Sequence, residues 1–270
     1  MNISDHPIGI FDSGVGGLTV AHAVVKALPN ENIIYFGDTA HLPYGEKSAA
    51  AIQSYSIKIA HMLLEQHCKM ILIACHSASS VAYDLVKEYV GSRAVVMNVI
   101  DPVIAILKAS FANQSVGLIG TKSTVQSNVY KKRIDALELD ITLKSLAVPM
   151  LVPAIEEGFH QGSIIESILG EYLARPALLD IHALVLACTH YPIVKNTIDA
   201  YYQQRVKLID PSEQAASAVL ARLKKENLQN KKDAPGIKQF FVSDYTTGFA
   251  EQAKLFFSES ITLTHYPLWE

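Results

Sequence analysis

Short apolar runs alternate with longer amphipathic stretches along most of this chain. The apolar runs lack the polar alternation of a half-exposed strand, so they predict strands that are buried on both faces. These runs are Ile8–Phe11, Ile33–Phe36, Met70–Ala74, Val95–Val99, Val116–Ile119, Ala183–Ala187 and Val206–Ile209. The stretches with helical periodicity include Ala49–Gln66, Ala78–Tyr89 and Thr124–Ala136. Strands and helices in alternation predict an α/β fold with mainly parallel sheets.

The chain also repeats itself. Three pairs of short segments match at separations of 108, 113 and 109 residues, and they are Gly9-Ile-Phe-Asp-Ser-Gly14 with Gly117-Leu-Ile-Gly-Thr-Lys122, Ala74-Cys75 with Ala187-Cys188, and Ile100-Asp-Pro102 with Ile209-Asp-Pro211. The repeat predicts two similar α/β domains around a shared cleft, one formed by residues 1–99 with 210–270 and the other by residues 100–209. Asp101 and Asp210 are predicted to cap helices, each with proline at the first helical position.

The composition of the chain limits its class and its location. Half of the 270 residues are apolar and the net charge is only −3, which argues against a general nucleic-acid binder. No apolar run approaches the roughly 18 residues that span a bilayer, and Met1–Asp12 lacks the apolar centre of a signal peptide. We therefore expect a cytoplasmic protein without a membrane or nucleic-acid partner.

The three cysteines are the first candidates for chemistry. Their odd number and the absence of C-x-x-C spacing argue against a disulfide framework and a zinc site. Cys75 and Cys188 each follow a predicted parallel strand and precede a helix, at the sheet edge where ligands bind. A helix N-terminus there lowers a thiol pKa and attracts carboxylates. A single such cysteine is as well explained as a small core residue, but two in matching positions favour catalysis, whereas Cys68 is predicted to be structural.

Polar loops follow other strands at the same edge. The glycines of Asp12–Gly17 permit close approach of an anion to the backbone, although the segment also fits a turn without a ligand. Its spacing is not G-x-G-x-x-G and no G-K-[ST] follows, so the nucleotide-binding fingerprints are absent. The hydroxyls of Gly120–Thr124 can either hold a carboxylate or cap the next helix.

These segments together resemble the glutamate racemases of bacterial cell-wall synthesis. The matching motifs are Phe11-Asp-Ser-Gly-Val-Gly-Gly17, Gly37-Asp-Thr39 with Pro43-Tyr-Gly45, Ala74-Cys75, Gly120-Thr121 through Thr124-Val-Gln-Ser127, Val152-Pro153 with Glu156, and Ala187-Cys-Thr-His190. The resemblance implies a two-domain enzyme that interconverts L- and D-glutamate for peptidoglycan synthesis, with neither pyridoxal phosphate nor metal. It also implies a homodimer.

The resemblance assigns roles to individual residues. Cys75 matches the thiolate that removes the α-proton of D-glutamate, and Cys188 the one that acts on L-glutamate. Asp12, His190 and Glu156 match acid–base helpers. The substrate-binding positions are Asp12, Ser13, Tyr44, Gly45, His76, Ser77, Thr121, Thr124, Thr189 and His190.

One departure and three rival functions stay open. His76-Ser77 stands where the family usually has Asn-Thr. A charged His76 would either hold a carboxylate more strongly and lower the pKa of Cys75, or misplace the substrate. We expect retained racemase activity with an altered pH dependence. The first rival is a racemase for aspartate or another amino acid. The second is a binding or regulatory protein without catalysis. The third is a cysteine hydrolase built on Cys188 and His190, which leaves Cys75 unexplained.

Overall fold

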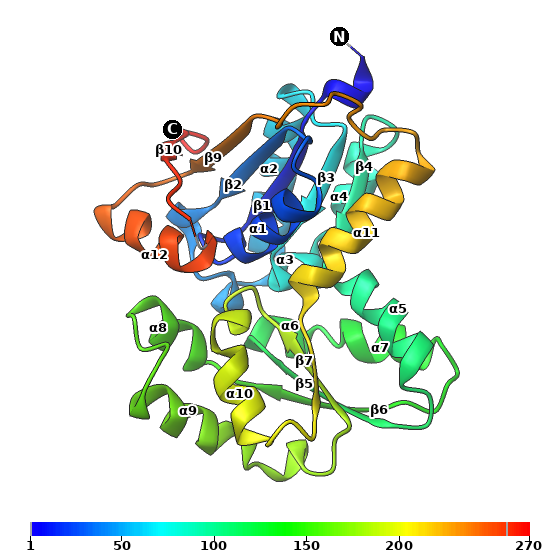
Figure 1. Ribbon diagram of the computed structural model, residues 1–270, viewed down its shortest axis with the longest axis vertical. Coiled ribbons are helices and arrows are strands. Elements are labelled where there is room, and N and C mark those ends of the chain that lie inside the picture. The colour runs from blue at the N-terminus through cyan, green and yellow to red at the C-terminus, as the bar shows by residue number, and fades with distance from the viewer. Residues whose placement is uncertain (1, 258) are drawn as a thin grey trace.

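The structure is a computed structural model that describes residues 2–257 and 259–270. It contains a six-stranded sheet with the order β10-β9-β2-β1-β3-β4 and a four-stranded sheet with the order β6-β5-β7-β8. All strand pairs are parallel. Figure 1 shows the two sheets in separate halves of the molecule, each with helices packed around it. The predicted α/β fold with parallel sheets is therefore confirmed.

The strands agree closely with the apolar runs of the sequence. They are β1 Ile8–Asp12, β2 Ile33–Gly37, β3 Met70–Ile73, β4 Val95–Asn98, β5 Ser115–Gly120, β6 Thr142–Ala147, β7 Ala183–Ala187, β8 Lys207–Ile209, β9 Lys238–Val242 and β10 Leu263–His265. Every residue of β1, β2, β3 and β7 is buried, which explains why these strands lack charged residues, except for Asp12 at the end of β1. The predicted burial on both faces is wrong for β4 and β8, because most of their residues are partly exposed. Strand β6 lies at a sheet edge and is partly exposed, so no apolar run marks it.

The two sheets share one strand order. In each half the first strand lies between the second and the third, and the fourth strand lies beyond the third. Cys75 follows β3 and Cys188 follows β7, so the two cysteines occupy equivalent places. This confirms two similar halves. The domain boundaries at residues 99 and 209 stay a prediction, although all strands of the smaller sheet lie between Ser115 and Ile209.

The helices depart from the predicted ones at specific residues. They are α1 Leu18–Ala27, α2 Ala49–Glu65, α3 His76–Val81, α4 Tyr83–Val90, α5 Ile100–Ser110, α6 Lys122–Gln126, α7 Val129–Asp135, α8 Leu151–Glu156, α9 Ser163–Leu173, α10 Lys195–Tyr201, α11 Pro211–Lys225 and α12 Thr247–Phe257. The expected helix Thr124–Ala136 is split because Asn128 adopts a left-handed conformation with φ of 55°, which asparagine tolerates better than most residues. The expected helix Ala78–Tyr89 is divided at Ala82.

The two Asp-Pro pairs turn out to differ. Asp210 caps α11 as predicted, with its side chain accepting from Ser212 N and Pro211 at the first helical position. Helix α5 instead begins at Ile100, and Asn98 Oδ1 accepts from the backbone N–H groups of Ile100 and Asp101 at 2.8 Å each. The predicted capping role of Asp101 is therefore wrong, because the asparagine three residues earlier already satisfies these donors.

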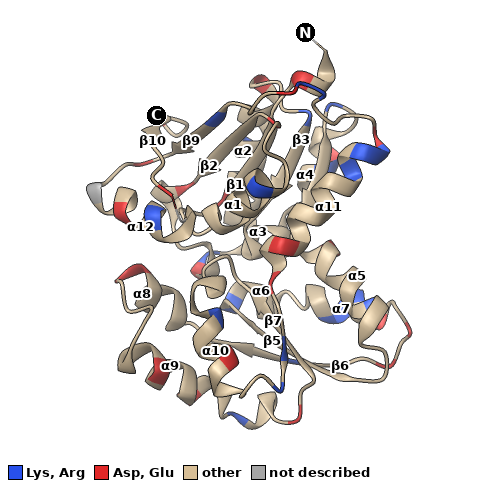
Figure 2. Ribbon diagram, in the orientation of Figure 1, with Lys and Arg blue, Asp and Glu red and all other residues tan. Residues whose placement is uncertain are grey.

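Charge is distributed over the whole molecule. Figure 2 shows Lys and Arg on elements of both halves, with no single element carrying most of them. Within the described residues, no helix is long and apolar enough to cross a membrane.

Candidate active site

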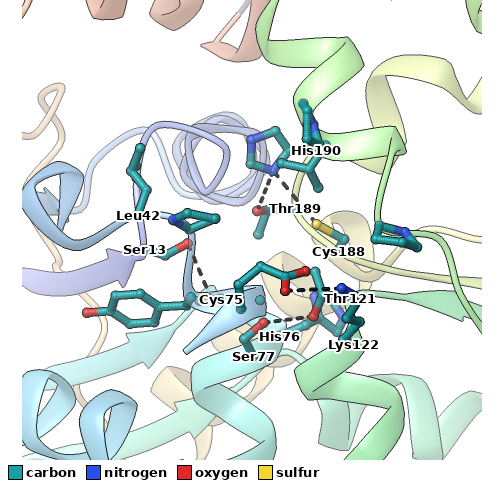
Figure 3. A pocket seen from close by; sticks show the side chains of 18 of the residues that line it. Ser13, Leu42, Cys75, His76, Ser77, Thr121, Lys122, Cys188, Thr189 and His190 are labelled. Carbon is teal, nitrogen blue, oxygen red and sulfur yellow. Dashed lines mark hydrogen bonds and ion pairs between the residues drawn. The ribbon is translucent and has the colours of Figure 1, made fainter. Parts of the chain in front are cut away.

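A pocket is lined by segments that follow strands of both sheets. Its walls come from the residues after β1, β2 and β3 in one half and after β5, β6 and β7 in the other (Figure 3). Most of the predicted site residues line it, namely Ser13, Tyr44, Gly45, Cys75, His76, Ser77, Thr121, Glu156, Cys188, Thr189 and His190. Asp12 and Thr124 are not in this lining. Predicted residues from both halves of the molecule therefore meet in one pocket.

Cys75 lies at the N-cap position of α3. Its Sγ accepts from Ala78 N at 3.5 Å and lies 3.7 Å from Ser13 Oγ, to which the thiol can donate. Burial, reinforced by the charge of Asp12, raises the pKa of Cys75 to about 12. The expected lowering by the helix N-terminus is wrong for this thiol, because loss of hydration and the nearby carboxylate outweigh the backbone N–H. Cys75 is therefore a thiol at neutral pH.

His76 opens helix α3 and is 3% exposed. Neither ring nitrogen has a hydrogen-bond partner among the described residues, and the ring stacks on Tyr130 at 6.4 Å between centroids. Burial lowers the pKa of His76 to about 3. The imidazole is therefore neutral at physiological pH, and the idea that a charged His76 lowers the pKa of Cys75 is wrong.

Cys188 has a different neighbour. His190 Nδ1 lies 3.7 Å from Cys188 Sγ, and His190 Nε2 lies 2.9 Å from Glu156 Oε1 at the end of α8. Burial alone would lower the pKa of His190, but its hydrogen bonds with Cys188 and Glu156 raise it to about 10. The result is a charged imidazole held between a sulfur and a carboxylate.

Asp12 ends strand β1 beneath the glycine turn. Its Oδ2 accepts from Gly17 N at 2.9 Å and Gly14 N at 3.2 Å, whereas its buried Oδ1 has no partner among the described residues. Burial raises the pKa of Asp12. The turn needs glycine because a Cβ on Gly17 would lie 2.3 Å from Asp12 Cβ, and one on Gly16 would lie 2.3 Å from His190 Cε1. The turn thus brings the first half into contact with the charged imidazole of His190, next to Cys188.

Hydroxyl groups connect the two halves on the other side of the pocket. Ser77 Oγ lies 3.0 Å from Thr121 Oγ1, which lies 3.1 Å from Thr124 Oγ1. Thr121 Oγ1 also accepts from Thr124 N, so it caps α6. The two roles left open for this segment, helix capping and pocket lining, therefore coexist at Thr121.

Sequence reasoning missed an ion pair in the pocket wall. Lys122 Nζ lies 3.2 Å from Glu46 Oε2, and both side chains are about half exposed. It also missed part of the apolar wall, formed by Leu42, Val148, Pro149 and Tyr191, whereas Pro43, Val152 and Pro153 in the same wall belong to the racemase motifs of the sequence. Charged residues on exposed turns are common, so nothing in the sequence marked Glu46 and Lys122 as partners.

The third cysteine, Cys68, does not line the pocket. Cys68 is buried in the core beneath β1 and α2, and burial raises its pKa to about 12, in agreement with a structural role. Within the described residues, no group of three or more His, Cys, Asp or Glu side chains could hold a metal ion.

Comparison with known proteins identifies the family. The sequence profile of the Asp/Glu/hydantoin racemases matches residues 8–219. The chain belongs to this racemase family. A glutamate racemase of Syntrophus aciditrophicus is 39% identical over 257 residues, covering 95% of this chain and 94% of that protein. One of Chlorobium phaeobacteroides is 40% identical over 269 residues, with coverage of 95% and 94%.

A solved racemase structure has the same fold throughout. Glutamate racemase from Francisella tularensis in complex with D-glutamate superposes with a TM-score of 0.91 and 38% identity, covering 98% of this chain and 99% of that chain. The motif resemblance is thereby confirmed over nearly the whole racemase chain.

Proposed function

We propose that the protein is a cofactor-independent glutamate racemase with Cys75 and Cys188 as its two acid–base groups. The observation that carries this proposal is the placement of two thiols, from equivalent positions of two similar halves, in one pocket. The named relatives are glutamate racemases over almost their full length. The D-glutamate formed would serve peptidoglycan synthesis.

The chemistry needs two groups on opposite faces of the substrate. One thiolate removes the α-proton while the opposite thiol returns a proton to the other face, so at any moment one sulfur carries a proton and the other does not. A charged His190 stabilises a thiolate at Cys188, and the raised pKa keeps Cys75 protonated. In this state the site is set to convert L-glutamate to D-glutamate.

The α-proton of an amino acid is only weakly acidic, so the developing negative charge must be stabilised. Preorganised donors on the substrate carboxylates supply this most effectively. The hydroxyls of Ser13, Ser77, Thr121 and Thr189 line the pocket for this purpose. Asp12 is the helper on the Cys75 side, and Glu156 acts through His190 on the Cys188 side.

Solvent deuterium exchange on each glutamate enantiomer tests the proposal. Cys75→Ser and Cys188→Ser should each abolish racemisation. Cys75→Ser should still exchange the α-hydrogen of L-glutamate, and Cys188→Ser that of D-glutamate, because each retains one functional thiol. If the unmodified protein exchanges no α-hydrogen, the proposal fails and a non-catalytic binding protein is favoured.

The same measurement separates the remaining rivals. Exchange on L-aspartate that exceeds exchange on L-glutamate would favour an aspartate racemase. A cysteine hydrolase would tolerate Cys75→Ser, because among the described residues a histidine contacts the sulfur of Cys188 but not that of Cys75. We assign the enzyme to the cytoplasm, since a reducing compartment keeps its three free thiols reduced. A homodimer stays a prediction from the resemblance alone.

A further inference from the structure

A buried carboxylate outside the pocket lining gathers four donors. Asp38 follows β2 and is fully buried. Tyr44 OH donates to its Oδ2 at 2.6 Å, while Ser243 Oγ and Trp269 Nε1 each donate to its Oδ1 at 2.8 Å. His41 Nδ1 lies 3.1 and 3.0 Å from the two oxygens. Burial of a carboxylate is costly unless hydrogen bonds compensate for the lost hydration, and here both oxygens of Asp38 have partners.

The donors come from three separate parts of the chain. His41 and Tyr44 belong to the loop after β2, Ser243 follows β9, and Trp269 follows β10. An aromatic cluster supports the network, since the rings of His41 and Tyr55 stack at 4.0 Å and Trp269 meets His41 edge-on at 4.4 Å. Asp38 therefore ties the end of the described chain to the loop after β2.

That loop is a wall of the pocket. Leu42 through Glu46 line it, and the loop also contacts the other half of the molecule. A Cβ on Gly45 would lie 2.9 Å from Thr121 Cβ, and Glu46 pairs with Lys122. The hydroxyl of Tyr44 donates its hydrogen bond to Asp38, so Tyr44 links this wall of the pocket to the buried carboxylate.

We propose that Asp38 is a positioning residue for glutamate binding and that Trp269 holds it in place from outside the pocket. This inference rests on the proposed racemase function, because the wall in question would face the substrate. Neither residue belongs to the pocket lining. Both thiols sit on other loops, after β3 and β7, so the network controls the fit of the substrate more than the proton transfer itself.

Trp269→Phe tests the inference with little change in packing. Phenylalanine keeps an aromatic ring beside His41 and Tyr55 but has no N–H for Asp38. Loss of a hydrogen bond to a charged group should raise KM about fivefold to tenfold for both enantiomers, with kcat within about twofold of the unmodified enzyme. Asp38→Asn should raise KM further, since an amide replaces one acceptor oxygen with a donor.

Tyr266→Phe is the matched control. It removes one hydroxyl from the same segment, where the ring packs on Phe36 and Phe241, and should leave KM unchanged. A KM within about twofold of the unmodified enzyme in both Trp269→Phe and Asp38→Asn, whatever their melting temperatures, would overturn the positioning role. Racemisation by the unmodified enzyme keeps that outcome distinct from failure of the proposed function.

The chain also carries a built-in reporter. Trp269 is its sole tryptophan, so its fluorescence reports on this network directly. D-glutamate should change the emission, with a midpoint close to its KM, and Asp38→Asn should reduce that change. Emission that does not respond to saturating D-glutamate would contradict the coupling.

Discussion

The two thiols lie in equivalent places, yet the histidines beside them are in opposite states. His76 follows Cys75 directly and is neutral, because burial lowers its pKa to about 3. His190 lies two residues after Cys188 and is charged, because its hydrogen bonds with Cys188 and Glu156 raise its pKa to about 10. A repeated fold has thus produced two unequal acid–base sites.

This inequality has a functional meaning. A racemase needs one protonated and one deprotonated group at the start of each turnover, and two identical sites would have to break their symmetry by chance. Here the surroundings make the two thiols unequal before the substrate binds. Burial and Asp12 favour the protonated form of Cys75, whereas the charged His190 lies beside Cys188. Substitutions at His190, His76 and Asp12 should reduce this inequality, with effects that decrease in that order.

The largest effect should come from His190→Asn. Removal of the charged imidazole should lower racemisation by about 10²- to 10⁴-fold, the range typical of a lost acid–base group. Because the equilibrium constant between enantiomers is one, kcat/KM must fall equally in both directions. The asymmetry should instead appear in deuterium exchange: the rate of α-hydrogen exchange should fall more for L-glutamate than for D-glutamate. His76→Asn serves as the control. If His190→Asn slowed exchange of D-glutamate more than exchange of L-glutamate, the assignment of Cys188 to L-glutamate would be reversed.

The second prediction concerns stability and acid. In the unfolded chain a histidine binds a proton below about pH 6.5. In the folded protein His76 stays neutral until the pH falls to about 3. Stability should therefore fall as the pH decreases through this window, by on the order of 2 kcal/mol at about pH 5. His76→Asn should remove this loss in denaturant titrations at about pH 8 and pH 5. Parallel pH dependences for the two proteins would show that His76 is not held neutral.

His190 should show the opposite behaviour. Its raised pKa means that its stabilising contribution is complete below about pH 6.5 and is lost as the pH rises towards about 10. The two histidines therefore oppose each other, and only comparison with a single variant isolates either contribution.

The smallest effect should follow Asp12→Asn. The amide oxygen can still accept from Gly14 and Gly17, but the charge that raises the pKa of Cys75 is gone. Alkylation of Cys75 by iodoacetamide at about pH 8.5 should accelerate, by on the order of tenfold, because loss of the carboxylate charge lowers the pKa of this thiol. Cys188 in the same sample is the internal reference in the mass spectrum. A rate at Cys75 equal to that of the unmodified protein would exclude Asp12 as its electrostatic neighbour.

Much of the fold followed from patterns that depend only on local burial. Strands enclosed on both faces, such as β3 and β7, are apolar throughout, and the repeat around Cys75 and Cys188 predicted two similar sheets. Strand β6 was not predicted, because a partly exposed edge strand does not need a continuous apolar sequence. The break at Asn128 depends on a single backbone conformation, which periodicity does not reveal.

The sequence predicted which residues line the pocket better than it predicted which of them are charged. Residues that follow neighbouring parallel strands meet at one sheet edge, so Ser13 could be expected beside Cys75, and Thr121 beside Thr189. Whether His76 or His190 carries a charge depends on partners distant in sequence, above all Glu156 on α8. The same holds for Asp38 and Trp269, which are 231 residues apart and share no motif.

The glycine turn restricts how the two halves can evolve. Gly16 of the first half leaves no room for a Cβ beside His190 of the second, and the hydroxyl of Thr19 donates to the carbonyl of Thr189 at 2.9 Å. A larger residue on either side would displace the imidazole that neighbours Cys188. Although the halves share a strand order, they can no longer diverge independently at this seam: a change in one is tolerated only with a compensating change in the other.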